Sequence, residues 1–251
     1  MKKILTSLAC VASLSTLANA DFLRAEMGVG AWSATPKGQI LGTTTGFTGF
    51  SGTDTAQEGA QTNVYAWALV KHFVPVVPNL RVEYVDITSE GKATGTLGST
   101  IIPDTTNTQI DMTQVDLIPY YNILDNTFWI TLDVGLDIKM IDVSYSVDKV
   151  AGSDGYTSSE TLALPLGYVR GRVQVPTTGF GVEADVKYVE YDNNIVYDVR
   201  AKVDYTFDIS PVIQPAIEIG YRMQKYQTDE TKDIALDLEY SGVYAGIMLR
   251  F

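Results

Sequence analysis

Tyr240-Ser-Gly-Val-Tyr-Ala-Gly-Ile-Met-Leu-Arg-Phe251 ends the chain, and its side chains alternate in character with a period of two. One set is apolar and closes on an aromatic ring: Val243, Ala245, Ile247, Leu249 and Phe251. The other set consists of Tyr244, Gly246, Met248 and Arg250. Because successive side chains of a strand point to opposite faces, this pattern predicts a strand with one continuous apolar face.

The first twenty residues have the pattern of a secretory signal. Lys2 and Lys3 precede an apolar run, and Ala18-Asn19-Ala20 provides a small-x-small cleavage site. The run is shorter than the roughly 20 apolar residues of a transmembrane helix. We therefore divide the chain into a signal peptide, residues 1–20, and a mature part, residues 21–251.

The composition of the mature part excludes several kinds of site. The only cysteine, Cys10, lies in the signal, so disulfides and thiolate metal sites are not expected. Without Lys2 and Lys3, 16 basic residues stand against 30 acidic ones, a net charge of −14. This excess argues against nucleic acid as a partner, since phosphates require a basic face. We expect no cofactor, and acidic loops on a cell surface fit the charge.

About ten segments of the mature part alternate in the same way. They cover residues 23–31, 61–73, 80–88, a stretch ending at 119–121, 128–139, 162–174, 180–188, 195–209, 216–224 and 243–251. Gly-, Thr- and Ser-rich segments without apolar period predict long loops at 33–60, 89–108 and 144–159. Compact turns are predicted at 74–79, 122–126, 176–179 and 210–215, and an acidic loop at 229–233.

Two segments contain both parities of apolar residue. Leu162 and Leu164 share the parity of Arg170 and Arg172, and Leu236, Leu238 and Tyr240 are out of step with the apolar face of the last strand. A β-bulge shifts the facing of a strand by one residue. The sequence therefore predicts one bulge near Pro165 and another near Ser241-Gly242.

The alternation predicts an all-β fold. After the signal, no apolar stretch is long enough for a membrane-spanning helix, and only helices and closed barrels satisfy every backbone group in hydrocarbon. We predict a transmembrane, antiparallel, up-and-down β-barrel of about 10 strands, with 8 strands as the alternative. A secreted β-sandwich or a lipocalin-like barrel would also alternate, because alternation alone does not say which face points inward. The signal, the unequal connections and the terminal Phe favour the membrane barrel.

The final strand and its terminal Phe251 resemble the closing strand of small, porin-like Gram-negative outer-membrane β-barrels. The resemblance implies residence in the cell outer membrane, contact with its lipid and lipopolysaccharide, and recognition by the barrel-assembly machinery. The implied assembly signal comprises Val243, Ala245, Ile247, Leu249 and Phe251. The last strand is expected to pair with residues 23–31 and close the sheet.

The connections predict the orientation. Short turns of bacterial barrels are periplasmic and long loops extracellular. Aromatic residues near the short turns predict one membrane girdle: Phe73, Tyr120, Tyr121, Phe128, Trp129, Phe180, Phe207 and Phe251. A second girdle is predicted toward the loops: Tyr84, Tyr188, Tyr197 and Tyr226.

The face opposite the apolar one is rich in charges of both signs, and we expect it to line the lumen. The predicted network comprises Arg24, Glu26, Arg81, Glu83, Asp116, Asp133, Asp137, Lys139, Arg170, Arg172, Glu183, Asp185, Lys187, Asp198, Arg200, Lys202, Asp204, Glu218, Arg222 and Arg250. Unpaired ions are costly in a confined space, so we expect interlocking salt bridges that fill a narrow barrel. The alternative is a polar passage for small solutes.

The sequence predicts a protein that is not an enzyme. The only histidine, His72, lies beside a short turn, at the periplasmic end, where an interfacial role suits it better than that of a general base. Asp133 and Asp137 share a face with Lys139 and are interpreted as ion-pairing residues. We therefore expect a structural membrane protein, or a porin-like one that lets small solutes pass through its narrow charged lumen. Surface adhesion or ligand binding through the long loops is the alternative; oligomeric state is not predicted.

Overall fold

A computed structural model describes residues 23–42, 50–56, 59–74, 76–97, 100–152, 154–192, 194–210, 212–227 and 234–251. The predicted signal peptide, Pro75, Pro211 and the acidic segment 229–233 lie outside these residues. Within them, no helix is long and apolar enough to cross a bilayer.

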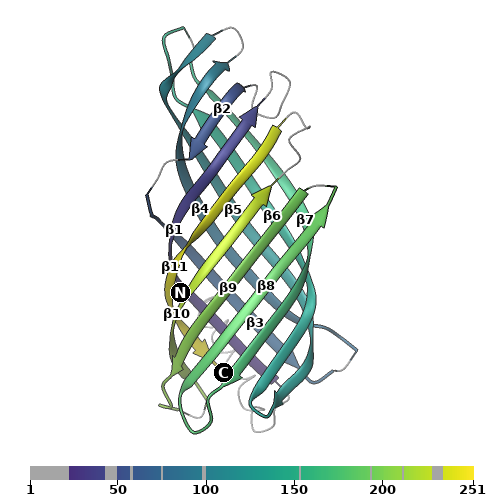
Figure 1. Ribbon diagram of the computed structural model, residues 1–251. Coiled ribbons are helices and arrows are strands. Elements are labelled where there is room, and N and C mark those ends of the chain that lie inside the picture. The colour runs from purple at the N-terminus through teal and green to yellow at the C-terminus, as the bar shows by residue number, and fades with distance from the viewer. Residues whose placement is uncertain are drawn as a thin grey trace, which may run out of the picture.

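The described chain is made of antiparallel strands (Figure 1). Their bounds are β1 Leu23–Gly42, β2 Phe50–Ala56, β3 Gln61–His72, β4 Asn79–Leu97, β5 Thr100–Thr127, β6 Ile130–Val147, β7 Tyr156–Gln174, β8 Phe180–Tyr191, β9 Asn194–Thr206, β10 Gln214–Gln227 and β11 Ile234–Arg250. Consecutive strands pair from β3 through β11, and β1 pairs with both β3 and β11. These ten strands close a barrel, which confirms the predicted fold class and excludes the 8-stranded alternative.

The short strand β2 adds to the wall without being one of the ten. It pairs with the last residues of β1 and with residues 91–97 of β4. These parts of β1 and β4 lie beyond Gln61, where β3 begins. We call this end of the barrel, uppermost in Figure 1, the loop end. The opposite end, which holds the short connections at 73–78, 128–129, 175–179 and 207–213, is the turn end.

Closure depends on the pairing of the first and last strands. Glu26 lies opposite Arg250, and the register continues without a shift to Gly42 opposite Ile234. The N–H of Phe251 donates to the carbonyl of Ala25 at 2.9 Å, which extends the seam to the last residue. The predicted pairing of the last strand with residues 23–31 is confirmed.

Most strands are longer than the alternation predicted. β1 continues to Gly42, β4 and β5 leave only residues 98–99 between them, and β6 and β7 reach Val147 and Tyr156. The described parts of the predicted loops at 33–60 and 89–108 are therefore largely paired strand, whereas the predicted loop at 144–159 is shortened to a connection between Val147 and Tyr156. The predicted turn at 122–126 also lies within β5, where two register irregularities occur, and the chain turns at Phe128 and Trp129 instead.

The two predicted bulges are wrong. The register of β6 with β7 runs without a shift past Pro165, and β11 keeps its register past Ser241 and Gly242 on both sides. The mixed parity has another cause, visible on β4. Near the turn end Arg81 and Glu83 face inward, whereas near the loop end Val85 and Ile87 face inward and are each 1% exposed. The character of the two faces is exchanged along the strand, not the facing of the backbone.

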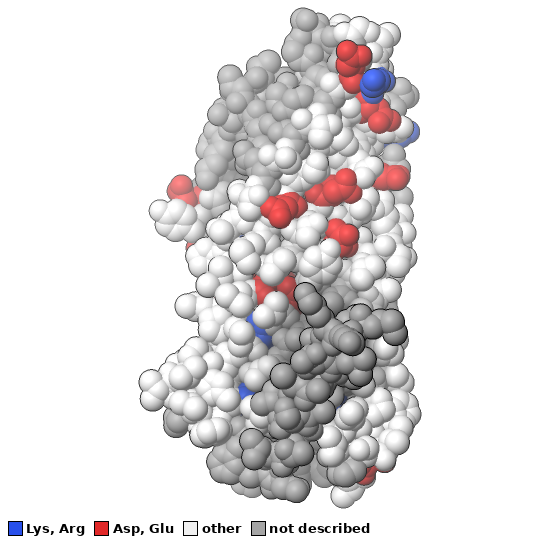
Figure 2. Space-filling view, turned by 180° about the vertical axis from the view of Figure 1, so that it is seen from behind, with Lys and Arg blue, Asp and Glu red and all other residues white. Residues whose placement is uncertain are grey.

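A row of polar residues marks the level of this exchange on the outer surface. Asp86, Thr113, Asp142 and Thr161 lie opposite one another on β4 to β7. Thr113 donates to Asp86 at 3.2 Å, and Thr161 donates to Asp142 at 2.5 Å. Figure 2 shows acidic side chains on the loop-end half of this face and few charges on the visible surface below. The apolar outer band therefore occupies the turn-end half of the wall.

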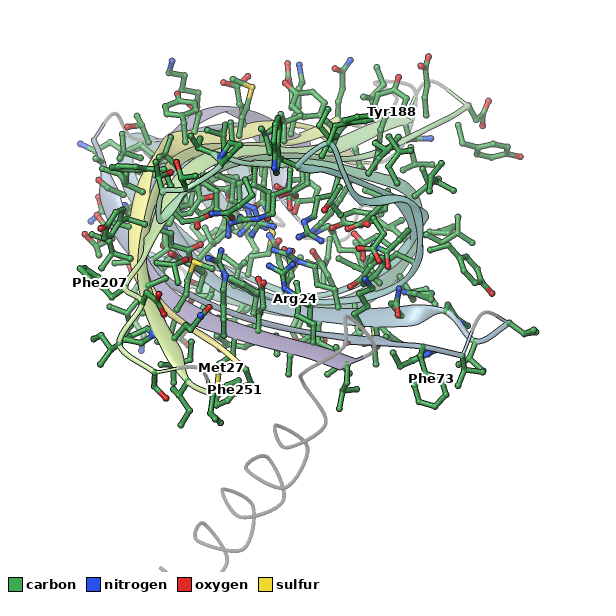
Figure 3. The ribbon with its side chains drawn as sticks, turned by 90° about the horizontal axis from the view of Figure 1, so that it is seen from below. Arg24, Met27, Phe73, Tyr188, Phe207 and Phe251 are labelled. Atoms are coloured by element: carbon green, nitrogen blue, oxygen red, sulfur yellow. The ribbon has the colours of Figure 1, made fainter. Side chains whose placement is uncertain are left out.

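Exposed aromatic rings border the apolar band. Phe73, Phe128, Trp129 and Phe180 are 67%, 83%, 55% and 48% exposed at the turn end, and Tyr84 and Tyr188 are exposed on the loop side. Figure 3 shows Phe73, Tyr188 and Phe207 pointing away from the barrel. Two predicted girdle residues were placed wrongly, however, because Tyr120 and Tyr226 point inward and are buried.

Candidate functional site in the barrel interior

The barrel interior has two layers of different chemistry. Side chains near the turn end and the middle are charged, and we call them the ionic layer. Nearer the loop end lies an apolar layer: Trp32, Ala34, Val85, Ile87, Ile110, Met112, Ile141, Tyr145, Val147, Val196, Tyr226, Leu238 and Tyr240. On β1, β4, β5, β6, β9, β10 and β11 these residues lie further toward the loop end than the buried charged residues of the same strand.

The structure places the predicted lumen residues in the ionic layer. Nineteen charged side chains are buried: Glu26, Arg81, Glu83, Asp116, Asp133, Asp137, Lys139, Arg170, Arg172, Glu183, Asp185, Lys187, Asp198, Arg200, Lys202, Asp204, Glu218, Arg222 and Arg250. Arg24 also points into the barrel (Figure 3), but its side chain is 42% exposed at the turn end. All of these residues were named from alternation alone.

Strand register accounts for many of the ion pairs. On β8 and β9, Glu183 lies opposite Lys202, Asp185 opposite Arg200, and Lys187 opposite Asp198. The two strands thus carry complementary charge in the same order. Cross-strand pairs of opposite charge stabilise a sheet, so these three pairs favour the observed register of β8 and β9.

At the turn end, two arginines, one on β7 and one on β11, reach past an intervening strand to a carboxylate of β9. Arg172 donates to Asp204 at 2.6 and 3.0 Å, and Arg250 donates to the same carboxylate at 2.8 Å. Arg250 also lies 3.2 Å from Glu26, which pairs with Arg24. Ion pairs therefore cross the seam between β1 and β11.

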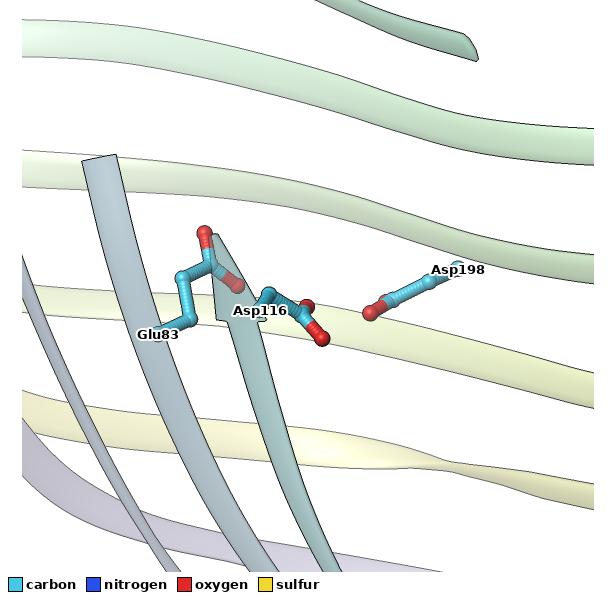
Figure 4. Close-up of side chains that lie close together, drawn as sticks. All are labelled: Glu83, Asp116 and Asp198. Atoms are coloured by element: carbon cyan, nitrogen blue, oxygen red, sulfur yellow. The ribbon is translucent and has the colours of Figure 1, made fainter. Parts of the chain in front are cut away.

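In the middle of the barrel, three buried carboxylates surround one ammonium group. Glu83, Asp116 and Asp198 come from three strands, and oxygens of all three lie within 4.8 Å of one another (Figure 4). The Nζ of Lys187 lies 2.7 Å from Glu83, hydrogen-bonds Asp116, and is 3.5 Å from Asp198. The charge that could attract a metal ion is thus met by a lysine of the chain itself.

Neighbouring cations complete the neutralisation of this cluster. Lys139 donates to Asp116 at 2.7 Å, Arg222 donates to Asp198 at 2.6 Å, and Arg200 donates to Glu83 at 2.8 Å. Buried ions are tolerated when they are paired and hydrogen-bonded, which is the case here. The cluster is therefore suited to holding strands together across the lumen.

Aromatic side chains on β3 cross the lumen at the same level. The ring of Trp67 contacts both Arg81 and Lys202, whose charged groups are 4.7 and 4.6 Å from its centroid. Its Nε1 donates to Glu218 at 3.1 Å, and the Tyr65 hydroxyl donates to the same oxygen at 2.8 Å. A Cβ at Gly28 would lie 2.5 Å from the Trp67 ring, so any side chain at this position would require the ring to move.

The predicted lumen network did not include these aromatic residues. Tyr65, Trp67 and Leu69 belong to the predicted strand 61–73, and the structure places all three on its inner face. The sequence contains one signal for this orientation. Lys71 shares the face of the three residues and brings a charge to it, whereas the opposite face carries the small residues Ala66 and Ala68. The apolar layer was missed entirely, because the prediction assumed one facing rule from end to end.

His72 lies where the sequence predicted, at the turn end. Its Nε2 lies 3.1 Å from the carbonyl of Pro78, and the N–H of Val74 donates to its Nδ1 at 3.2 Å. Both ring nitrogens thus contact the backbone of one turn. This arrangement fits a residue that fixes the turn.

The predicted assembly residues form part of the outer wall. Val243, Ile247 and Leu249 are 52%, 64% and 38% exposed, and Ala245 is also exposed. Phe251 is half-buried at the seam with β1. The apolar face quoted from the sequence is therefore the outward face of β11.

No protein-family model matches the chain, and no curated protein matches it in sequence. Its fold is similar to that of the outer-membrane protease OmpT of Escherichia coli, with a TM-score of 0.53 and 10% identity over 93% of this chain and 98% of that one. The translocator domain of the autotransporter NalP from Neisseria meningitidis gives a TM-score of 0.46, with 12% identity over 99% and 96% of the two chains. The transport unit of the autotransporter AIDA-I from Escherichia coli gives 0.44, with 9% identity over 96% and 95%.

These comparisons concern the fold. The likeness to OmpT covers nearly the whole of both chains and agrees with the closed barrel of ten strands. At such low identity it carries no information on catalysis or ligands. The chain therefore has the fold of the outer-membrane β-barrels.

Proposed function

We propose that the protein is a structural, non-enzymatic barrel of the outer membrane whose lumen is closed by its own side chains. The observation that carries this proposal is the ionic layer, in which 19 charged side chains are buried inside the barrel. The apolar layer lies between the ionic layer and the loop end. Barrels of about eight strands are filled by side chains, and those of 16 or more enclose channels, so ten strands favour a filled interior.

A planar-bilayer recording tests closure directly. We expect no discrete conductance from the purified wild-type protein. Joint replacement of Arg200 and Asp185 by alanine removes a facing pair linked at 2.9 Å and is expected to produce small, discrete currents. The matched control replaces the exposed pair Lys225 and Asp237 by alanine and should produce no discrete current. Discrete wild-type currents would instead favour the porin-like alternative, passage of small solutes.

The absence of enzymatic activity is part of the proposal. His72 contacts the backbone of a turn through both ring nitrogens, which leaves no free nitrogen for proton transfer to a substrate. We expect refolded protein to hydrolyse neither peptides nor phospholipids. Hydrolysis that is abolished by His72→Ala, with an unchanged barrel by circular dichroism, would refute this.

A surface-binding role is the second candidate, and the length of the loop-end strands favours it. β2, the last part of β4 and the first part of β5 form a paired extension that rises above the rest of the wall in Figure 1. Such a scaffold holds its tip rigidly for a ligand or another cell. Replacing residues 94–103 by a two-residue turn should abolish adhesion of cells carrying the protein if this role is correct, while the heat-stable migration of the folded barrel persists.

We also propose that the outer face of β11 is recognised by the barrel-assembly machinery, and that the finished wall contacts outer-membrane lipid and lipopolysaccharide. The apolar outward face of β11 supports this. Deletion of Phe251 should lower the amount of folded protein in the outer membrane several-fold, while the purified variant still folds in detergent. Equal assembly of the two forms in cells would contradict the proposal.

A further inference from the structure

Among the buried charged side chains of the ionic layer, ten carboxylates stand against nine cations. Its nine buried cations all have an ion pair, and nine buried carboxylates share them: Glu26, Glu83, Asp116, Asp133, Glu183, Asp185, Asp198, Asp204 and Glu218. Arg24, the partly exposed cation, pairs with Glu26. Among the described residues, Asp137 is the buried carboxylate for which no ion pair remains.

Asp137 is also without a hydrogen-bond donor from the protein. Its side chain is 0% exposed, and neither Oδ1 nor Oδ2 has a partner. Asp137 lies on β6 opposite Leu166 of β7, which is 1% exposed. On its other side the register of β6 with β5 brings it next to Ile118 of β5, which is 0% exposed. Its immediate neighbours on the adjoining strands are thus apolar.

The charged groups that face Asp137 are engaged elsewhere. They are Lys187 of β8, Asp116 of β5, Lys139 of β6 and Glu83 of β4. The next titratable groups are Asp133 on β6 itself, Tyr120 on β5, and Tyr168 and Arg170 on β7. Lys139 donates to both oxygens of Asp116, at 2.7 and 2.9 Å, and Lys187 bridges Asp116 and Glu83. Arg170 binds Asp133 and Glu183. Each of these cations is therefore already ion-paired with a carboxylate other than Asp137.

We propose that Asp137 is a proton-binding site in the lumen, a neutral carboxylic acid among nine ionised carboxylates. A buried ionised carboxylate without a partner is far more costly than a neutral acid, so binding a proton is the least costly state of this group. With Asp137 neutral, the nine buried cations balance the nine remaining buried carboxylates. When Asp137 loses its proton it competes with Asp116 for Lys139 and Lys187, and the centre of the ionic layer loosens.

The inference predicts a particular pH dependence of stability. The unfolded chain releases the proton of an ordinary aspartate near pH 4, whereas the folded barrel retains it. Between that pH and the higher pH at which folded Asp137 loses its proton, the native state binds one proton more than the unfolded state, so the free energy of unfolding falls as the pH rises across this interval. Replacing Asp137 by asparagine, which is neutral at every pH, should remove this contribution.

Urea unfolding in lipid vesicles at several pH values between 5 and 9 measures the effect. Asp137→Asn should unfold at the same or higher urea than wild type, with a shallower dependence on pH by the equivalent of one proton. Asp185→Asn is the matched control, because Asp185 is ion-paired with Arg200 at 2.9 Å. It should unfold at lower urea throughout and leave the contribution of Asp137 in place. An Asp137→Asn variant that is less stable, or that keeps the wild-type slope, would show that Asp137 is ionised.

Infrared spectroscopy tests the proton itself, even if a variant folds poorly. The folded wild-type protein at neutral pH should show the carbonyl stretching band of a buried carboxylic acid, shifted by exchange into deuterated water. The band should persist in Asp185→Asn and be missing from Asp137→Asn. Its absence from the wild-type spectrum would overturn the proposal.

Discussion

The ionic layer and the apolar layer fill the same tube by opposite means. In the turn-end half of β4, Arg81 and Glu83 face inward and the outer side chains are apolar. In the loop-end half, Val85 and Ile87 face inward and Asp86 and Glu90 face outward. The first half has the pattern of a membrane barrel, and the second has that of a water-soluble one. The difference indicates that the outer surroundings of the wall change along each strand.

The turn-end and loop-end halves of the wall differ although one continuous set of backbone hydrogen bonds runs through both. Backbone hydrogen bonds do not depend on which face is polar, so the register runs on while the side chains exchange roles. Each half places its apolar residues away from water: outward in the turn-end half, inward in the loop-end half. We infer that the row at Asp86, Thr113, Asp142 and Thr161 marks the outer boundary of the hydrocarbon.

The strongest way to break the ionic layer is to remove its central cation. Lys187→Met should lower the free energy of unfolding by about 3–5 kcal/mol, because Glu83, Asp116 and Asp198 would lose a shared partner in a buried site. Equilibrium unfolding by urea in vesicles measures this. The double variant Lys187→Met with Asp116→Asn should recover part of the loss, since one excess negative charge is removed. A double variant that is weaker than the single one would mean that packing, not charge, dominates.

The corresponding test of the apolar layer is Ile87→Ala. We expect a loss of roughly 3 kcal/mol, from transfer free energy and the cavity left behind. The loss should be the same from pH 5 to pH 9, because no charge is involved. Ile87→Val, the matched control, should cost about 1 kcal/mol. If Ile87→Ala has no effect, the loop-end half is not closely packed and the contrast with the ionic layer fails.

A substitution at Gly28 probes the junction between aromatic and ionic packing. Gly28→Ala should destabilise the barrel by about 1–3 kcal/mol, because the new methyl group would meet the Trp67 ring and displace it from its contacts with Arg81 and Lys202. Unfolding followed by tryptophan fluorescence measures both stability and the environment of the ring. Gly171→Ala, where no atom lies within 4 Å of the added Cβ, is the control and should have a much smaller effect on both.

The smallest effect is expected outside both layers. Lys225 and Asp237 form an ion pair of 3.3 Å on the outer surface near the loop end, where the side chains are 24% and 57% exposed. Lys225→Ala should change the free energy of unfolding by less than about 1 kcal/mol, and added salt should reduce the difference. A loss as large as that of Lys187→Met would mean that water does not reach this level of the wall.

The sequence alone predicted the membrane-type half of the barrel well. Alternation on residues 128–139 and 195–209 placed Asp133, Lys139, Asp198 and Arg200 on the inner face, and strand pairing then explains Asp185 with Arg200. It did not predict the grouping of Glu83 with Lys187, since these residues meet across the lumen rather than along a ladder. That contact depends on the stagger of ten strands, which no local pattern contains.

The loop-end half was misread for a definite physical reason. Leu164 and Tyr240 are apolar and face inward, as the interior of any water-soluble barrel requires, but they were interpreted by the rule that holds in lipid. Two bulges were then predicted to reconcile them with their neighbours. Apolar residues face outward on the turn-end side of the polar row and inward on its loop-end side. This exchange explains the mixed parity without any irregularity in the backbone.

The seam between β1 and β11 has a consequence for the order of events in biogenesis. Glu26 and Arg250 are neighbours, so the two strands that close the barrel are the first and the last in the described chain. Until β11 pairs with it, β1 has an open edge, and such an edge readily pairs with other chains. A chain stopped before Ile234 would have no partner for this edge of β1, so truncation should expose it to association with other chains.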